Sequence, residues 1–198
     1  MDDMPLSKAS KQRTEIVLIR QHPSPLGPLW SHWTTKGLQQ LNWQAPSSDH
    51  SKRGTPGPGT QADMLDALLH GYFTGKKVSW HNLMLDRTGW TTFTKHVYEY
   101  CIEIPIGKTI TYKELATLAG NDKASRAVGA AMSRNRILLV VPCHRVVSTT
   151  GNLQGYSAKG GISTKHLLLE LERQGRWPQD LFDEGQGRCS WQTNPVKT

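Results

Sequence analysis

Cysteine is scarce in this sequence, and long apolar runs are absent. The three cysteines, Cys101, Cys143 and Cys189, are too few and too far apart for a disulfide framework, and their spacing fits no zinc ribbon. The longest apolar run spans residues 137–141, whereas a membrane helix needs roughly 20 apolar residues. The N-terminal MDDMPLSKASKQR has charges but no apolar segment behind them. We therefore expect no membrane span, no secretion and cysteines that act singly.

Acidic residues are also in deficit. The 198 residues carry 24 Lys and Arg against 16 Asp and Glu, which gives a formal net charge of +8. Such an excess favours polyanionic partners, although the signal is weak by itself because many basic proteins never bind nucleic acid. A chain of this length forms one domain or two small ones.

The N-terminal region is predicted to be a small structural domain over residues 1–90. Residues 15–43 alternate apolar and polar positions in short runs (EIVLIR, PLWSHW, LQQLNW) separated by turn-formers, which predicts an antiparallel sheet. The segment 46–60 combines Pro, Gly, Ser and charge without periodicity, so we expect a flexible surface loop. Apolar residues then recur at helical spacing from Leu65, and Gly75 ends that helix.

Residues 91–175 are predicted to form a second, mostly helical domain, followed by a tail at 176–198 without an assigned role. A first helix ends before Pro105 and places Cys101 in the core. Thr111 and Glu114 form a capping box that starts a second helix.

After a break at residues 120–122, a short third helix over residues 125–132 completes a helix-turn-helix. This last helix is nearly all Ala, Gly and Ser outside Arg126, Val128 and Met132. These small side chains give the helix a smooth face, which fits two interpretations equally well: tight packing on a neighbouring helix, or close docking on DNA.

The run PCHRVV at residues 142–147 follows an apolar segment, residues 137–141, that predicts a buried strand. Cysteine chemistry requires the thiolate, so Cys143 needs a group that takes its proton. His144 is the nearest candidate and is expected to act through a water, since neighbouring side chains on extended backbone point apart. Glu172 lies on the apolar face of a C-terminal helix and could orient His144, but it could equally form a salt bridge with Arg145.

Three stretches together resemble the O6-alkylguanine-DNA alkyltransferases. They are PCHRVV, ITYKELATLAGNDKASRAVGAAMSRN at residues 110–135 and GYS at residues 155–157, collinear with the family from about residue 93 to residue 172. SPLGPLW and GYFTGKK in the first region match the family more loosely. The resemblance implies an α+β fold: a small N-terminal antiparallel sheet with a helix (ribonuclease-H-like), and a mostly helical C-terminal domain with a helix-turn-helix.

The resemblance also implies DNA repair by direct reversal. Such a protein binds double-stranded DNA through the minor groove, flips O6-alkylguanine out of the stack, and transfers the alkyl group irreversibly to its own cysteine, once per molecule. By position, the catalytic residues would be Cys143 as acceptor, His144 and Glu172 as a water-linked relay, Tyr112 as the group that helps protonate the leaving base, and Asn135 as a brace. Arg126 would fill the gap in the duplex, and the other DNA contacts would be Thr94, Tyr112, Lys113, Asn121, Ser125, Ala127 and Thr149. The substrate pocket would be lined by Val146, Tyr156, Ser157 and Leu138.

No cofactor is expected, because displacement by sulfur at an alkyl carbon needs only a thiolate and a leaving base that receives a proton. Some relatives hold a structural zinc in the first domain, but the corresponding positions here are Thr34 and Gln39, so no metal is predicted. Two further departures, an insertion near Ala158 and Lys159 and a leucine at Leu138 where many relatives carry proline, are expected to alter the pocket wall.

Two other functions compete with this one. A DNA-binding module without chemistry, such as a transcription factor or a lesion sensor, would explain the helix-turn-helix but not Cys143, and the smooth helix lacks the bulky polar side chains of major-groove readout. A cysteine hydrolase would use Cys143 and His144, although such dyads come from residues distant in sequence. We expect a monomer, with cooperative binding on DNA left open, that is nuclear in a eukaryote and cytoplasmic in a bacterium.

Overall fold

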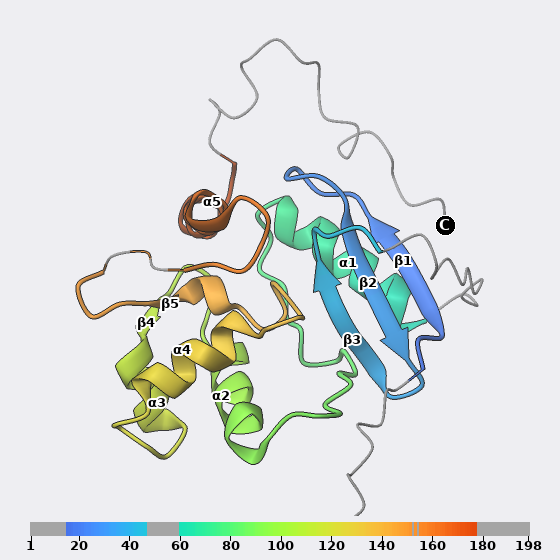
Figure 1. Ribbon diagram of the computed structural model, residues 1–198. Helices are drawn as coiled ribbons and strands as arrows, with labels where there is room; N and C mark the ends of the chain where they lie inside the picture. The colour runs from blue at the N-terminus through green and yellow to red at the C-terminus, as the bar shows by residue number, and fades with distance from the viewer. Residues whose placement is uncertain (1–14, 47–59, 152, 154, 178–198) are drawn as a thin grey trace, which may run out of the picture.

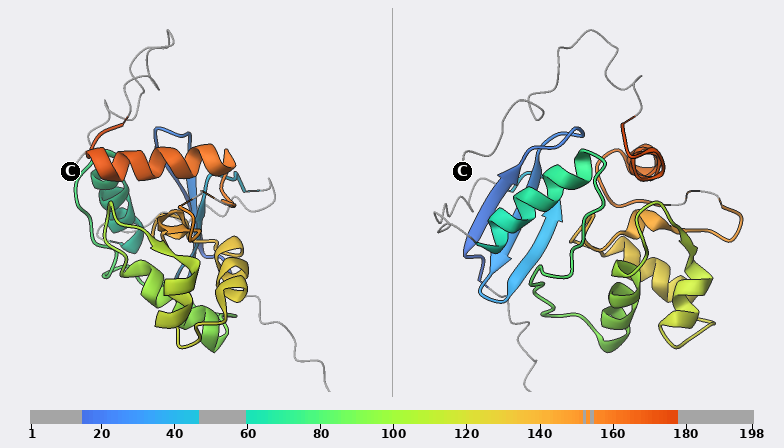
Figure 2. Two further views of the ribbon diagram at one scale, coloured as in Figure 1. Left: turned by 90° about the vertical axis from the view of Figure 1, so that its left-hand side faces the viewer. Right: turned by 180° about the vertical axis from the view of Figure 1, so that it is seen from behind.

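A three-stranded antiparallel sheet with one helix against it forms the N-terminal part of the computed structural model (Figure 1), which describes residues 15–46, 60–151, 153 and 155–177. The strands β1 (Leu18–His22), β2 (Leu29–Thr34) and β3 (Gly37–Asn42) lie in sequence order, and helix α1 (Gln61–Phe73) crosses one face of the sheet (Figure 2). The predicted sheet and helix are thus confirmed. The predicted loop lies outside the described residues except for its two ends, Pro46 and Thr60.

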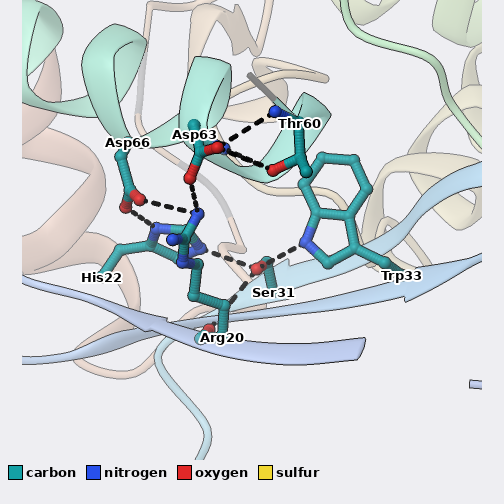
Figure 3. Close-up of polar contacts among 7 residues, drawn as sticks. All are labelled: Arg20, His22, Ser31, Trp33, Thr60, Asp63 and Asp66. Carbon is teal, nitrogen blue, oxygen red and sulfur yellow. Dashed lines mark hydrogen bonds and ion pairs between the residues drawn. The ribbon is translucent and has the colours of Figure 1, made fainter. Parts of the chain in front are cut away.

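A partly buried polar network fastens α1 to the sheet (Figure 3). Arg20 of β1 forms ion pairs with Asp63 at 2.7 Å and Asp66 at 3.0 Å, both on α1. His22 contacts Asp66 through Nδ1 and Ser31 through Nε2. Although an Asp–His–Ser series is also the order of a hydrolase triad, His22 and Ser31 are both 0% exposed, so no substrate reaches this serine and the network is structural.

The C-terminal part is helical, as predicted. Its helices are α2 (Thr92–Ile102), α3 (Tyr112–Leu118), α4 (Ser125–Ser133) and α5 (Gly161–Gln174), and the short strands β4 (Ile110–Thr111) and β5 (Val146–Val147) pair in parallel. Helices α3 and α4 form the predicted helix-turn-helix (Figure 1). The capping box at the start of α3 is present, because Thr111 and Glu114 bond each other's backbone N–H groups.

The apolar segment at residues 137–141 is buried but is not the predicted strand. Only Ile137 forms a β-bridge, with Leu41 of β3, and the chain then turns through Leu139, whose φ is 69°. The Leu138 N–H donates to the Leu41 carbonyl at 2.9 Å, and the Leu41 N–H donates to the Arg136 carbonyl at 2.8 Å. The prediction was wrong because a run of apolar residues reports burial, whereas hydrogen bonding to the edge of β3 decides the backbone path.

One hydrophobic core spans the predicted boundary between residues 90 and 91. It includes Leu41 and Phe73 on one side and Val97, Leu139 and Leu168 on the other. Trp177, which the sequence assigned to a separate tail, is buried in the same core and stacks on Phe73. Among the described helices, none has the length and apolar character of a membrane span.

Candidate active site

Cys143 begins a short 3₁₀ helix, η2 (Cys143–Arg145), instead of ending a strand. Its thiol is 5% exposed and accepts a hydrogen bond from Asn135 Nδ2 at 3.2 Å. Burial raises the pKa of the Cys143 thiol to about 11, even though the Asn135 hydrogen bond and the Lys165 charge act in the opposite direction. The thiol is therefore protonated at neutral pH, because desolvation outweighs the groups that favour the thiolate, and it still needs the proton acceptor that the sequence predicted.

His144 and Glu172 form the pair that the sequence predicted. His144 Nε2 lies 2.7 Å from Glu172 Oε1, and both side chains are buried. Burial lowers the pKa of His144, while Glu172 opposes that shift, so the imidazole is neutral and donates Nε2–H to the carboxylate. Nδ1 of His144 has no hydrogen-bond partner among the described residues. Its lone pair is therefore available to take a proton.

Glu172 also forms the salt bridge that the sequence offered as the alternative. Arg145 Nη2 donates to Oε1 at 2.9 Å, and Arg145 Nε donates to Oε2 at 3.0 Å. Although burial raises the pKa of Glu172, His144 and Arg145 hold it well below its usual range. The carboxylate thus serves both as partner of the histidine and as counter-charge of a buried arginine.

Two further donors reach Glu172, and the sequence analysis named neither. Tyr72 OH of α1 donates to Oε1 at 2.7 Å, and the Gly107 N–H donates to Oε2 at 3.1 Å. Tyr72 lies one hundred positions earlier in the chain, so no local pattern in the sequence connects it with Glu172.

Lys165 is a fully buried lysine beside the thiol that sequence reasoning also missed. Its Nζ donates to the Val146 carbonyl at 2.6 Å and lies 6.0 Å from the centre of the Tyr112 ring. Burial lowers the pKa of Lys165, and Cys143 opposes the shift. The spacing from Lys165 to Leu168 and Glu172 places all three on one face of α5, which is the signal that could have revealed it.

A cavity of about 750 Å³ opens in front of Cys143. Of the residues predicted for the site, Tyr112, Lys113, Ser125, Arg126, Cys143, Thr149, Tyr156 and Ser157 line it. Thr94, Asn121, Ala127, Val146 and Leu138 are not among the lining residues, and Asn135, His144 and Glu172 lie behind the cysteine. Leu138 is 2% exposed with its backbone on the edge of β3, so its predicted place in the pocket wall is not observed.

Helix α4 supplies one wall of the cavity through Arg126, Gly129 and Ser133, which recur at helical spacing. Met132 also lines the cavity, and neither it nor Gly129 was among the predicted pocket residues. Arg126 is exposed, and a Cβ added at Gly129 would have no heavy atom of another element within 4 Å. Within the described part of the chain, nothing of another element therefore packs on α4 at Gly129, whereas Val128, Ala131 and Met132 on its other side are buried.

The described residues include no group of three or more His, Cys, Asp or Glu side chains that could hold a metal ion. Thr34, one of the two positions at which the sequence predicted no metal ligand, donates to Asp86 at 2.8 Å. The floor of the cavity carries the Cys143 thiol, and behind it lie a neutral imidazole and a buried carboxylate, groups that suit attack by sulfur.

Three comparisons bear on this geometry. Residues 92–174 match the family described as 6-O-methylguanine DNA methyltransferase, DNA binding domain. A Mycobacterium tuberculosis protein named methylated-DNA–protein-cysteine methyltransferase is 39% identical over 167 residues, which cover 84% of this chain and 98% of that protein. A Methanosarcina mazei protein of the same name is 45% identical over 153 residues, which cover 75% of this chain and 92% of its own.

Solved structures agree. The crystal structure of Mycobacterium tuberculosis OGT in complex with DNA superposes with a TM-score of 0.69 at 38% identity, covering 84% of this chain and 100% of that one. An O6-methylguanine-DNA methyltransferase from Pyrococcus kodakaraensis superposes with a TM-score of 0.57 at 26% identity, covering 78% and 97%. The similarity thus extends over both the sheet and the helical part.

Proposed function

Since this chain belongs to the methylated-DNA–protein-cysteine methyltransferase family, we propose that it repairs O6-alkylguanine in double-stranded DNA by moving the alkyl group onto Cys143. The observation that carries the assignment is a buried thiol, hydrogen-bonded by Asn135 and backed by His144 and Glu172, at the floor of a cavity walled by the helix-turn-helix.

The transfer step follows from these groups. The sulfur of Cys143 attacks the alkyl carbon, an S–C bond forms and the bond between that carbon and O6 of guanine breaks. The thiol proton passes through a water to Nδ1 of His144, and the resulting imidazolium is stabilised by Glu172. The leaving guanine receives a proton with the help of Tyr112, whose pKa is raised by burial so that its hydroxyl stays protonated. Since a thioether does not hydrolyse, each molecule reacts once.

The target base must leave the stack to reach this thiol. Cys143 is 5% exposed and lies below the cavity mouth, so a base inside the duplex cannot contact it. Unstacking costs a few kcal/mol, and Arg126 on the exposed start of α4 would fill the gap and offset that cost. The uncrowded surface of α4 around Gly129 fits the narrow minor groove.

The remaining predicted roles form part of the proposal. Thr94, Lys113, Asn121 and Thr149 would contact the DNA backbone, Ser125 and Ala127 would contact the DNA, and Tyr156 and Ser157, which line the cavity, would contact the extruded base. Val146 is buried and does not line the cavity, so it is not included. The relatives above are bacterial and archaeal, so of the two compartments predicted we propose the cytoplasm and find no support for the nucleus. We propose a monomer of two domains that meet near residue 90.

Mass spectrometry tests the proposal directly. Incubation with a duplex containing O6-methylguanine should add one methyl group to Cys143 in a tryptic peptide, without a second turnover, and Cys143→Ala should bind the same duplex without gaining mass. Unmodified wild-type protein that still binds the lesion would support a sensor instead.

Arg126→Ala should slow repair of the duplex more than reaction with the free base, and equal slowing would contradict the role in base flipping.

A further inference from the structure

The carboxylate of the relay formed by Cys143, His144 and Glu172 is held in part from the N-terminal sheet domain. Tyr72, in the last turn of α1, donates its hydroxyl hydrogen to Glu172 Oε1 at 2.7 Å and lies 3.5 Å from His144 Nε2. The same oxygen accepts from His144 at 2.7 Å. The Tyr72 side chain is thus in contact with both members of the pair that takes the thiol proton.

Three more contacts join the C-terminal ends of α1 and α5, which lie together in Figure 2. The Phe73 and Trp177 rings stack at 6.0 Å, and Trp177 Nε1 donates to the Phe73 carbonyl at 2.9 Å. Gly75 and Gly175 approach so closely that a Cβ added at Gly75 would overlap the Gly175 carbonyl. We call these three contacts the α1–α5 clasp.

We propose that Tyr72 is a positioning residue for alkyl transfer, because its hydroxyl keeps Glu172 Oε1 opposite His144 Nε2 whenever the clasp is closed. The inference rests on the proposed function. It gives the N-terminal domain a part in the reaction, although that domain contributes none of the residues that line the cavity.

The other donors to Glu172 cannot take over this role. Arg145 follows His144 in η2 and also donates from Nη1 to the Ile104 carbonyl at 2.6 Å, so it joins Glu172 to η2 and to the chain just after α2 but not to the N-terminal sheet domain. Gly107 bonds the other oxygen, Oε2. Burial and the nearby carboxylate hold the pKa of Tyr72 well above its usual range, so the hydroxyl remains a donor at all physiological pH values.

His144 also faces other charged or titratable groups, which must be kept constant in any test of pH dependence. They are Glu172 and Lys165 from α5, Arg145 from η2, Tyr72 from α1, and Tyr156, whose ring lies 6.4 Å from that of His144. Tyr72→Phe removes one hydroxyl from this set and leaves every charge in place.

The experiment compares Tyr72→Phe with Tyr98→Phe in single-turnover methyl transfer from an O6-methylguanine duplex across neutral and alkaline pH. Tyr98 is the matched control, because it is also buried and its hydroxyl donates to the Ala131 carbonyl at 2.9 Å, away from Glu172. We expect Tyr72→Phe to transfer about 2- to 10-fold more slowly at neutral pH, the effect of one lost hydrogen bond. Proton transfer to His144 becomes harder when the carboxylate is less fixed, so the rate should recover toward that of the wild type only as pH approaches the thiol pKa of about 11, where the thiolate forms without the relay. The rate profile should therefore move to higher pH.

Duplex affinity and the thermal unfolding midpoint should change no more in Tyr72→Phe than in Tyr98→Phe. A pH profile identical to that of Tyr98→Phe overturns the proposal and leaves the proposed function intact, whereas a wild-type protein that gains no methyl group contradicts the function itself. If Tyr72→Phe does not fold, the pH profile of Trp177→Phe tests the proposal instead. This variant loses the hydrogen bond to Phe73 without touching the relay, and it should shift the profile in the same direction; an unchanged profile overturns the proposal.

Discussion

At the scale of single residues, the proposed nucleophile, the Cys143 thiol, is in its protonated form before the reaction. Burial holds the Cys143 thiol protonated, with a pKa of about 11, while the neighbouring imidazole is neutral and its Nδ1 has no partner in the part of the chain that the structure describes. In the proposed reaction the thiol would therefore lose its proton to His144 during the transfer and not beforehand. Such an arrangement protects the sulfur from oxidants and small electrophiles, which attack thiolates.

Asn135 is the direct donor to the sulfur, so its removal tests how far the thiolate depends on it. A hydrogen bond to a charged group contributes about 1.5–3 kcal/mol, and Asn135→Ala should therefore slow methyl transfer roughly 10- to 100-fold. Rapid-quench measurement of the transfer rate checks this expectation. Because Asn135 also bonds Val141 and Ile137, the thermal midpoint must be measured beside it. A stable variant with an unchanged rate would remove Asn135 from the mechanism.

Glu172 links the site to stability. Glu172→Gln leaves buried Arg145 without its counter-charge and should lower the free energy of unfolding by about 3 kcal/mol at neutral pH. The folded pKa of Glu172 is depressed, so its contribution is complete above the unfolded value of about 4.3 and is lost as pH falls below it. Denaturant unfolding over a pH series should show the gap between variant and wild type narrowing below that value. A constant gap would mean that the charge is not responsible.

At the scale of elements, helix α4 combines two properties that usually conflict. Its buried side packs Val128, Ala131 and Met132 into the core, while Arg126 and Gly129 leave its outer side with one cation and little bulk. A glycine in a helix interior lowers stability by about 0.5–1 kcal/mol relative to alanine. The open surface at Gly129 therefore makes α4 less stable than an alanine there would.

A substitution at Gly129 separates folding from DNA docking. Because nothing from other elements lies within 4 Å of a Cβ there, Gly129→Ala and Gly129→Leu should both be as stable as the wild type or slightly more stable. On the groove-facing side, however, the leucine should weaken duplex binding and slow duplex repair at least about 10-fold, the effect of roughly 1.4 kcal/mol, while alanine should have a smaller effect. Fluorescence anisotropy with a lesion duplex measures this order. Equal affinities would place the DNA elsewhere.

At the scale of the whole molecule, the relay depends on elements from both ends of the described chain. The edge of β3 holds the turn at residues 136–138 that leads into Cys143, and α1 meets α5 through the α1–α5 clasp. The hydrophobic core is continuous across the two parts. Loss of the hydrogen bonds to β3, or of the α1–α5 clasp, should therefore alter the surroundings of Cys143.

Gly75 tests the clasp as a structural element, with Gly89 as its control. Both glycines have left-handed backbone, with φ of 79° and 82°, so an alanine at either position is strained by a similar amount. A Cβ at Gly75 overlaps Gly175, whereas one at Gly89 meets nothing within 4 Å. Gly75→Ala should therefore lose about 1–3 kcal/mol more stability than Gly89→Ala. Denaturant unfolding compares the two, and equal losses would argue against tight docking of α5 on α1.

The sequence by itself determined the local features and the chemistry. Alternation, capping and helical spacing identified the sheet, the helix-turn-helix and the apolar face of α5 that carries Glu172, because each depends on neighbours a few residues apart. PCHRVV pointed to Cys143 as the proposed nucleophile, and the family is confirmed by the chain's relatives.

Only the tertiary structure decided how distant groups meet. The path of residues 137–141 depends on hydrogen bonds to β3, the protonation of Cys143 depends on how much protein excludes water from it, and Tyr72 reaches Glu172 across one hundred positions. Desolvation and long-range hydrogen bonds are properties of the packed chain, and no local pattern of residues encodes them.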